Sequence, residues 1–560
     1  MKKGKKSTVR LRDILPVCIL FLFFSLAELP LMVKNRYAGF DFAPDNALQY
    51  DQFLVAKVFL LLFLALWILI TVLLRFRHSL NFKELIPGML LFLFLMLSFI
   101  FSVNKTVSLT GANELFEPFP VLVSYIIVFY GTGLIVKNSP GSRDEKLLLI
   151  MKCVGINVLI SCLWGILQAL KGDPAAVSLY NPDYVGSYAA VLLPVFVLMI
   201  IGFFEKRSAL LWKMLLLLSF LLILLLILSG SSAGMMGAAT GVFFGILLFF
   251  FGRDKRIMAV TAGIIATAAL ILTLFLRNTS YAPSYYSDFR LQTGGKYAEF
   301  SVGDEKICIR EDFDEFGYEE FTILNQDGES ISYEGDPERN TFVAQLPENS
   351  VFKDFHFNPM ELKDGERGFF VHCADRDFYF GEDESGNCHS MNAYGKLVDL
   401  TPAETAGLFR DREAFLHGRG YIWDRSLPLL KRYAFTGCGP DAFPFIFLQN
   451  DVEKILRSGL PYEELVLKPH NFYLQTALQL GLPFLFILLF MAGRILLTAV
   501  GVFAKTDPEP DRREKIIAAA LAASLVAFLV TGFINDSSLC VTPLALALFA
   551  TGFYYLKEES

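Results

Sequence analysis

The hydrophobic residues of this chain are gathered into long uninterrupted blocks rather than alternating with polar residues. A block of about 18 to 25 apolar residues can cross a hydrocarbon core of about 30 Å as a helix. Runs such as LLLLSFLLILLLIL also exclude a transmembrane β-barrel, whose strands alternate over about ten residues. The pattern predicts twelve membrane-spanning helices, near residues 14–33, 53–74, 85–102, 120–136, 147–170, 186–204, 209–228, 235–251, 257–276, 476–500, 516–534 and 541–556.

Composition supports this interpretation. Of the 560 residues, 54% are hydrophobic and only 19% are charged, whereas a soluble domain has about 25% charged residues. The sequence is therefore that of an integral membrane protein, and the soluble-enzyme, disordered and collagen-like classes are excluded. The basic start of the chain is like that of a signal peptide. Its apolar stretch of about 20 residues lacks a small-residue cleavage site, so we expect a retained first helix.

Charge is distributed unevenly along the chain. Residues 279–410 contain 27 acidic and 11 basic side chains, a net charge of −16, although the whole chain carries only −6. The predicted short connections on one side of the membrane hold 23 Lys and Arg residues, and those on the other side hold four. Because basic residues favour the cytoplasmic side, we expect both termini inside and residues 277–475 outside.

The predicted fold class is a polytopic α-helical membrane protein of about 12 helices with an extracytoplasmic β-rich insert. Residues 1–276 would hold the first nine spans and residues 476–560 the last three. Between them, residues 277–410 contain alternating runs such as KICIR, EFTIL and FFVHC separated by turn signals, which predicts strands. Residues 411–475 differ, because Trp423, Leu427, Leu430 and Tyr433 are spaced for one face of a helix.

Five short motifs carry a family resemblance. They are NPDY at 181–184, SGSSAG at 229–234, GRGYIW at 418–423, TGCGPDAF at 436–443, and HN at 470–471 with Gly481 after nine further residues. In this order and with this topology, the chain resembles the O-antigen ligase and O-antigen polymerase family, over roughly residues 180–535 without the insert. Two features depart from the family pattern: Ser232 stands where the family has an arginine, and the acidic insert is no common feature.

The resemblance implies a function. A GT-C-like membrane glycosyltransferase of the bacterial cytoplasmic membrane would transfer a glycan from a polyprenyl-diphosphate carrier to an acceptor hydroxyl on the outer face. Its partners would be the lipid-linked donor, a glycan, lipid or protein acceptor, and the bilayer, with no nucleic acid. No cofactor or metal is expected, because neither carboxylate pairs nor His clusters accompany the motifs. Whether the acceptor makes it a ligase or a polymerase is left open.

Two residues are the predicted catalytic groups. His470 follows Pro469, a residue favoured in the first turn of a helix, and the positive helix terminus would keep the imidazole neutral as a base for the acceptor proton. Arg419 offers a guanidinium fork that matches diphosphate oxygens. Lys468 is a second, weaker cation. The plainer alternatives are a solvent-facing or capping His470 and an Arg419 that contacts a lipid headgroup or pairs with Asp424.

The remaining candidates for substrate binding are polar residues in or near the motifs. Asn471, Gln475 and Gln479 follow at intervals of four, which predicts a polar stripe that either lines a cavity or bonds neighbouring helices. Trp423 is expected to be a packing anchor rather than a sugar platform, and Asp441 a cap in a rigid turn. Asn181 enters through the resemblance of its motif. Glu28, at the outer edge of the first span, is either functional or simply solvated.

The insert contains one further set of candidates, His372, Cys373, Cys388 and His389. Their spacing does not fit a compact zinc site, so either a hairpin disulfide between the two cysteines or two free thiols is expected. Two alternative functions were considered. A secondary transporter would show repeated halves, which are not seen here. A non-catalytic envelope sensor that binds through the insert would leave the Arg419 and His470 segments unexplained.

Overall fold

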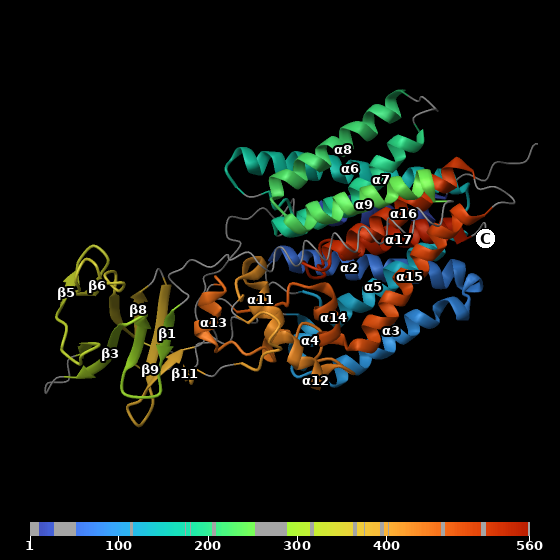
Figure 1. Ribbon diagram of the computed structural model, residues 1–560. Coiled ribbons are helices and arrows are strands. Elements are labelled where there is room, and N and C mark those ends of the chain that lie inside the picture. The colour runs from blue at the N-terminus through green and yellow to red at the C-terminus, as the bar shows by residue number, and fades with distance from the viewer. Residues whose placement is uncertain are drawn as a thin grey trace, which may run out of the picture.

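The computed structural model is dominated by a bundle of long helices with a β region at one end (Figure 1). It describes residues 10–26, 52–111, 116–173, 175–179, 181–203, 209–252, 288–313, 319–361, 367–373, 376–391, 397–400, 403–410, 412–460, 465–505 and 511–557. The predicted span at 257–276 and Glu28 lie outside these residues.

The bundle contains most of the helices. They are α1 (Leu11–Phe23), α2 (Gln52–Thr71), α3 (Phe82–Ile100), α4 (Lys105–Thr110), α5 (Phe119–Asn138), α6 (Arg143–Leu170), α7 (Pro182–Phe203), α8 (Ala209–Ser229), α9 (Ser232–Phe251), α15 (Leu482–Ala504), α16 (Arg512–Thr531) and α17 (Thr542–Lys557). Among the described residues, nine helices are long and apolar enough to span a membrane. Helices α1 and α17 occupy the places of the first and last predicted spans, but they have only 13 and 16 residues.

The prediction of the tenth span is wrong in its first part, where two helices replace the expected single one. Residues 476–500 were expected to form one helix, but α14 (Phe472–Leu480) ends at Gly481 and α15 begins directly after it. Gly481 has a φ of +91°, and a Cβ atom there would lie 2.2 Å from the carbonyl oxygen of Phe435. The chain can turn here only because the residue has no side chain. Pro483 in the first turn of α15 then suits the start of a new helix.

Small residues allow close packing between α7, α9 and α16. A Cβ atom on Gly234 would lie 2.5 Å from the Cα of Gly186, and one on Gly241 would lie 2.6 Å from the carbonyl oxygen of Ala523. Such close approach is typical of helices that associate in a membrane, where van der Waals contact replaces the hydrophobic effect. It fixes the start of α9 against the first turns of α7.

Two antiparallel sheets form the β region, as the alternating runs predicted. The four-stranded sheet has the order β1 (Phe289–Gln292), β2 (Ala298–Val302), β3 (Glu305–Phe313), β4 (Glu319–Asn325). The seven-stranded sheet has the order β11 (Leu397–Val398), β10 (Cys388–Met391), β9 (Arg376–Glu382), β8 (Arg367–Cys373), β7 (His356–Glu361), β6 (Thr341–Ala344), β5 (Tyr333–Asp336). Inward residues alternate as expected; Phe369, Val371 and Cys373 of β8 are all buried.

Between the sheets and the bundle lie the short helices α11 (Phe415–Ser426), α12 (Leu430–Tyr433), α13 (Val452–Arg457) and α14 (Figure 1). The helix predicted in this segment is present, but its first turn is distorted, since Leu416, His417 and Gly418 have positive φ. The hydrophobic core of the β region continues into this layer, through residues such as Tyr421, Phe447 and Ile455. The β region is therefore packed onto the segment that carries the predicted catalytic residues.

Candidate functional site

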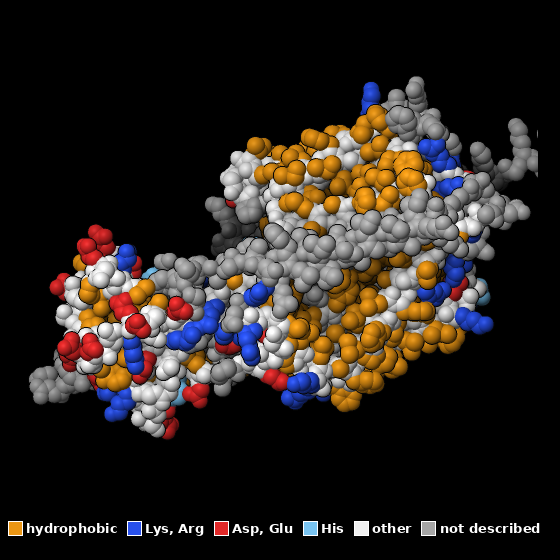
Figure 2. Space-filling view, viewed as in Figure 1, with side chains coloured by type: hydrophobic (Ala, Val, Ile, Leu, Met, Phe, Trp, Pro, Cys, Tyr) orange, Lys and Arg blue, Asp and Glu red, His pale blue; other side chains and the backbone are white. Residues whose placement is uncertain are grey.

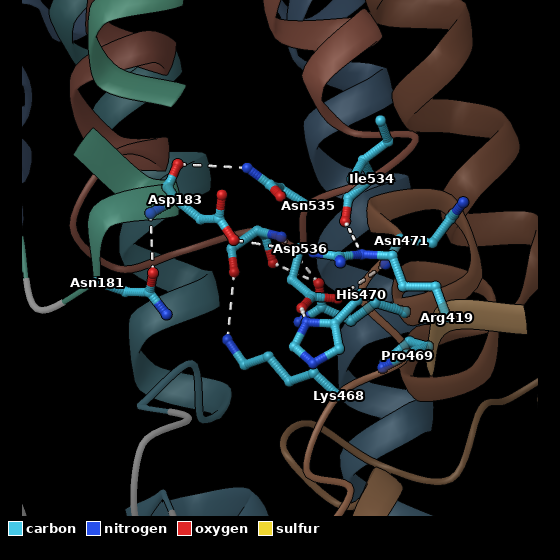
Figure 3. A network of polar contacts seen from close by, with 12 residues as sticks. Asn181, Asp183, Arg419, Lys468, Pro469, His470, Asn471, Ile534, Asn535 and Asp536 are labelled. Carbon is cyan, nitrogen blue, oxygen red and sulfur yellow. Dashed lines mark hydrogen bonds and ion pairs between the residues drawn. The ribbon is translucent and has the colours of Figure 1, made fainter. Parts of the chain in front are cut away.

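Three predicted site residues meet two further acidic residues at the end of the bundle that faces the β region (Figures 1 and 3). The group consists of Asp183 in the first turn of α7, Arg419 in α11, Lys468 and His470 before α14, and Asp536 between α16 and α17. The motifs at 181–184, 418–423 and 470–471, which are far apart in sequence, thus converge on one place.

His470 lies just before α14 with a φ of +49°. The expectation that Pro469 and His470 begin the helix is wrong, because Asn471 takes the N-cap position and its side chain accepts the Leu474 N–H at 2.9 Å. A non-glycine residue with positive φ is uncommon and persists only where its surroundings hold it. His470 is thereby kept outside the helix, with its side chain 46% exposed.

The imidazole of His470 is paired with a buried carboxylate. Its Nδ1 lies 2.9 Å from Oδ2 of Asp536, whose side chain is only 2% exposed. The other carboxylate oxygen accepts the backbone N–H of Asn471 at 3.0 Å. A carboxylate at Nδ1 selects the tautomer that carries its proton there, so that Nε2 becomes the accepting nitrogen.

Asp536 is held in its charged form despite its position. Burial by itself raises the pKa of this carboxyl, but the charge and hydrogen bond of His470 and the charges of Lys468 and Arg419 outweigh burial and lower it. Three cationic or potentially cationic groups therefore face one carboxylate. The sequence analysis missed Asp536. The only signal was the polar string Asn535 to Ser538 in an otherwise apolar connection between two spans.

Arg419 reaches toward the same place. Its Nε donates to the carbonyl oxygen of Ile534 at 2.9 Å, its Nη1 to that of Leu416 at 3.0 Å, and its Nη2 lies 3.8 Å from Oδ2 of Asp183. Burial lowers the pKa of Arg419, while Asp183 and Asp536 act against this. The alternative pairing with Asp424 is wrong, because that carboxylate accepts backbone N–H groups of the 408–409 segment instead.

Lys468 is more deeply buried than Arg419 and is surrounded by acids. Its Nζ donates to the carbonyl oxygen of Ser537 at 3.3 Å and lies 3.9 Å from Oε2 of Glu117. Burial lowers its pKa, but Tyr184 and the carboxylates of Glu117 and Asp536 raise it overall. Lys468 is thus a permanent internal positive charge behind the His470 and Asp536 pair.

Asp441 is completely buried beside this lysine. Its Oδ2 accepts the backbone N–H of Glu117 at 2.8 Å, while its Oδ1 has no hydrogen-bond partner among the described residues. Burial is the main cause that raises the pKa of Asp441 to about 8, against the opposing charge of Lys468. This residue therefore links two connections of the chain and carries a proton at neutral pH.

Gln475 and Gln479 point into the protein. Gln475 Oε1 accepts the backbone N–H of Ser537 at 2.9 Å, and its Nε2 donates to Oε2 of Glu117 at 3.4 Å. Both glutamines are buried, at 2% and 3% exposure. The polar stripe was expected either to line a cavity or to bond neighbouring helices. For Gln475 the structure shows bonding to neighbouring segments. Substrate binding by Asn471 and Gln475 stays a prediction.

Trp423 and Asn181 form hydrogen bonds to the backbone next to His470 and at Asp183. The indole N–H of Trp423 donates to the carbonyl oxygen of Pro469 at 2.8 Å, and its ring packs against Phe409 and Phe415. The tryptophan therefore anchors the residue that precedes His470. Asn181 accepts the backbone N–H of Asp183 at 2.8 Å and lies directly before α7.

A pocket adjoins the buried side of Asp536. Its empty space, together with the adjoining solvent, is about 300 Å³, and its walls come from α7, α14, α16 and α17 and from the connection that holds Asp536. Polar wall residues include Ser187, Thr531, Asn535 and Thr542, and apolar ones include Phe472 and Phe528. The polar group thus borders a cavity that extends between helices.

The insert shows neither of the two bonded alternatives. Cys373 and Cys388 are free, as are the other six cysteines, so the disulfide is not formed and the two-thiol alternative holds. His372 instead pairs with Asp377, and His389 lies between Asp383 and Asp399. No group of three or more metal-ligating side chains occurs in the part of the chain that is described.

Comparisons with known proteins give no further guidance. No protein-family model, curated protein or solved structure matches this chain.

Proposed function

We propose that this protein transfers a glycan from a polyprenyl-diphosphate carrier to an acceptor hydroxyl at the outer face of the bacterial cytoplasmic membrane, like the O-antigen ligase and polymerase family that it resembles. The observation that carries the proposal is the pairing of a half-exposed His470 with the buried Asp536, 2.9 Å apart. Arg419 and Lys468 lie beside this pair at the end of an apolar helical bundle.

In the proposed reaction, Nε2 of His470 accepts the proton of the acceptor hydroxyl as its oxygen attacks the anomeric carbon of the donor sugar. The bond from that carbon to the diphosphate oxygen breaks, and the lipid diphosphate leaves with the electron pair. Asp536 keeps the ring in the required tautomer and stabilises the imidazolium that forms. Positioned proton transfer of this kind contributes about 10² to 10⁴ in rate.

Arg419 is the proposed ligand of the diphosphate. A guanidinium has five N–H donors, and Arg419 uses two of them on carbonyl oxygens of the described residues. The contact of Nη2 with Asp183 is long, at 3.8 Å. A diphosphate would replace Asp183 as its anionic partner with closer, bidentate bonds. Lys468 adds a fixed positive charge from behind.

The distribution of charged side chains supports the proposed orientation. On the face that Figure 2 shows, many hydrophobic side chains lie on the bundle, and Lys and Arg side chains gather at the end opposite the β region. The helix ends that carry Lys137, Arg143, Arg512, Arg513 and Lys557 are basic. Under the positive-inside rule that end is cytoplasmic, which puts the His470 group and the acidic β region outside.

The test replaces the chromosomal copy of the gene with one that carries His470→Ala. Surface glycan and lipid-linked glycan are then measured in these cells. We expect surface glycan to be lost and lipid-linked donor to accumulate, with the protein still inserted. His372→Ala is the matched control, since it removes the histidine of an exposed His–Asp pair in the β region. Accumulated long chains would identify a ligase and single repeat units a polymerase. Normal surface glycan in His470→Ala cells would refute the proposal.

A further inference from the structure

A second polar group lies at the opposite end of the bundle, where α3, α5, α15 and α17 pack together (Figure 1). These helices form an open, shallow pocket whose empty space, together with the adjoining solvent, is about 350 Å³. Its polar lining consists of Arg494, Lys557, Glu84, Tyr130 and Tyr554, and its remaining walls are apolar. The pocket shares no residue with the His470 group, so it is independent of the proposed transfer reaction.

Arg494 is the unusual member of this group. It lies in the middle of α15, a helix with the length and hydropathy of a membrane span. Among the described residues its guanidinium makes no hydrogen bond or ion pair; it lies 6.0 Å from the ring of Phe490, and the carboxylate of Glu84 is near enough to interact with its charge. A charged side chain within a membrane span is costly and normally has an anionic or polar partner. Among the described residues, Arg494 therefore has no directly bonded anionic partner.

The other polar groups can share an anion with Arg494. Lys557 Nζ lies 2.8 Å from Oε1 of Glu84, so one carboxylate balances one of the two cations and leaves a net positive charge. Among the described residues, the Tyr130 hydroxyl donates to the sulfur of Met491 at 3.7 Å, and sulfur is a weak acceptor. A phosphate oxygen would be a stronger acceptor for both the phenol and the guanidinium.

The surroundings of the pocket are lipid-facing. On α15, Phe490 and Leu497 are 59% and 72% exposed, and on α3, Ile86 and Leu90 are 41% and 39% exposed. The contact of Arg494 with the exposed Phe490 places the guanidinium at the border of this apolar surface. A ligand that enters here must carry an anionic group together with apolar chains.

We propose that this pocket binds the phosphate group of an anionic phospholipid whose acyl chains lie along α3 and α15. Basic pockets between membrane helices are known to take anionic headgroups. Free phosphate shares the headgroup chemistry but not the acyl chains, so the exposed apolar flanks favour the lipid.

The test uses the purified full-length protein in a neutral detergent. The protein is titrated separately with phosphatidylglycerol, phosphatidylcholine and inorganic phosphate. Native mass spectrometry counts the molecules of each that stay bound. We expect saturable binding of phosphatidylglycerol, and a dissociation constant about tenfold higher for Arg494→Gln, which corresponds to about 1.4 kcal/mol. Lys557→Gln should weaken binding as well and serves as a second variant if Arg494→Gln does not fold.

The matched control is Lys152→Gln. Lys152 is an exposed cation within α6, and the first turn of that helix contacts the end of α17, through Asp144 and Tyr555 at 3.2 Å. Its removal should leave the dissociation constant unchanged. Equal losses in Lys152→Gln and Arg494→Gln would show general attraction to basic residues and overturn the site. Equal binding of phosphatidylcholine would refute the anionic requirement, and binding of inorganic phosphate as tight as that of phosphatidylglycerol would refute the lipid assignment.

Discussion

The protein contains two kinds of His–Asp pair, and they differ in what surrounds them. His470 and Asp536 are 2.9 Å apart at the end of the bundle, and His372 and Asp377 are 2.7 Å apart in the β region. The carboxylate is 2% exposed in the first pair and 45% exposed in the second. Similar distances thus occur in two different electrostatic environments, and burial of the acid distinguishes them.

The origins of the two pairs differ as well. His372 and Asp377 are direct partners in the register of β8 and β9, so the sheet itself brings them together. His470 and Asp536 are joined only when α14 docks against the connection between α16 and α17, through bonds such as Phe472 N–H to Gly532 carbonyl oxygen at 2.8 Å. An exposed pair contributes little, because water and salt screen it. In the buried pair, neighbouring cations stabilise the charged carboxylate and offset the cost of burying it.

The largest expected effect follows from removing the buried charge. Asp536→Asn should lower turnover of purified donor and acceptor by about 10² or more, since the amide neither stabilises imidazolium nor fixes the tautomer. Asp377→Asn is the equivalent change in the exposed pair and should alter turnover less than twofold. Donor binding should persist in both variants, which equilibrium binding of the lipid-linked donor can measure. Near-normal turnover of Asp536→Asn would remove the functional distinction between the pairs.

The next effect concerns the cation beside the buried pair. Arg419→Ala should reduce turnover about ten- to hundredfold, the range of a lost charge-assisted pair, and Arg419→Lys should do almost as badly, because lysine lacks the bidentate fork. In the β region, Arg376→Lys is the control and should have no effect. If Arg419→Lys retained full turnover, a single positive charge would be enough for turnover. The proposed bidentate hydrogen bonding of Arg419 to the diphosphate would then be wrong.

Ser232 offers a gain-of-function check on the same cation. Ser231, its neighbour, packs against Gly186 in the first turns of α7, close to Asp183. An arginine at position 232 can therefore approach the group from α9. We expect Ser232→Arg to restore part of the turnover that Arg419→Lys loses. No restoration in a stably inserted double variant would mean that the two positions do not share one diphosphate.

A smaller effect is expected on stability and its pH dependence. The pKa of Asp441 is raised from 3.8 to about 8, so between these values the folded chain holds a proton that the unfolded chain has released. The free energy of unfolding should then fall as pH rises, by at most about 1.4 kcal/mol per pH unit. Asp441→Asn removes this slope, and asparagine tolerates the positive φ of 54°. Melting midpoints should agree below pH 3.8 and increasingly favour the variant as the pH rises toward 8; parallel curves would contradict this.

Much of the fold could be predicted from the sequence, because helices and strands leave local patterns along the chain. Apolar blocks predicted long helices, and alternation predicted the strands of the β region, including the inward side of β8. The break at Gly481 was missed because it depends on the Phe435 carbonyl, a contact from a distant segment. The apolar window over residues 476–500 shows no interruption that would reveal it.

The site was predictable only in part, for the same reason. Arg419, Lys468 and His470 stand in motifs, and the structure brings them together. Asp536 belongs to no motif that was recognised, and its importance comes from the docking of α14 against the end of α16. A pattern along the chain can propose a base, whereas the partner that orients it is fixed by tertiary packing.

The smallest expected effect is that of metal removal. The β region offers the nearest approach to a metal site, where His389 lies between Asp383 and Asp399, whereas the oxygens of Asp536 are occupied by His470 and by the Asn471 N–H. If catalysis rests on proton transfer and cationic side chains alone, a chelator should change turnover by less than twofold. Turnover of purified protein before and after chelation and dialysis measures this. A loss that returned on adding a divalent cation would show that the diphosphate is held by metal, and Arg419 would then be a supporting residue.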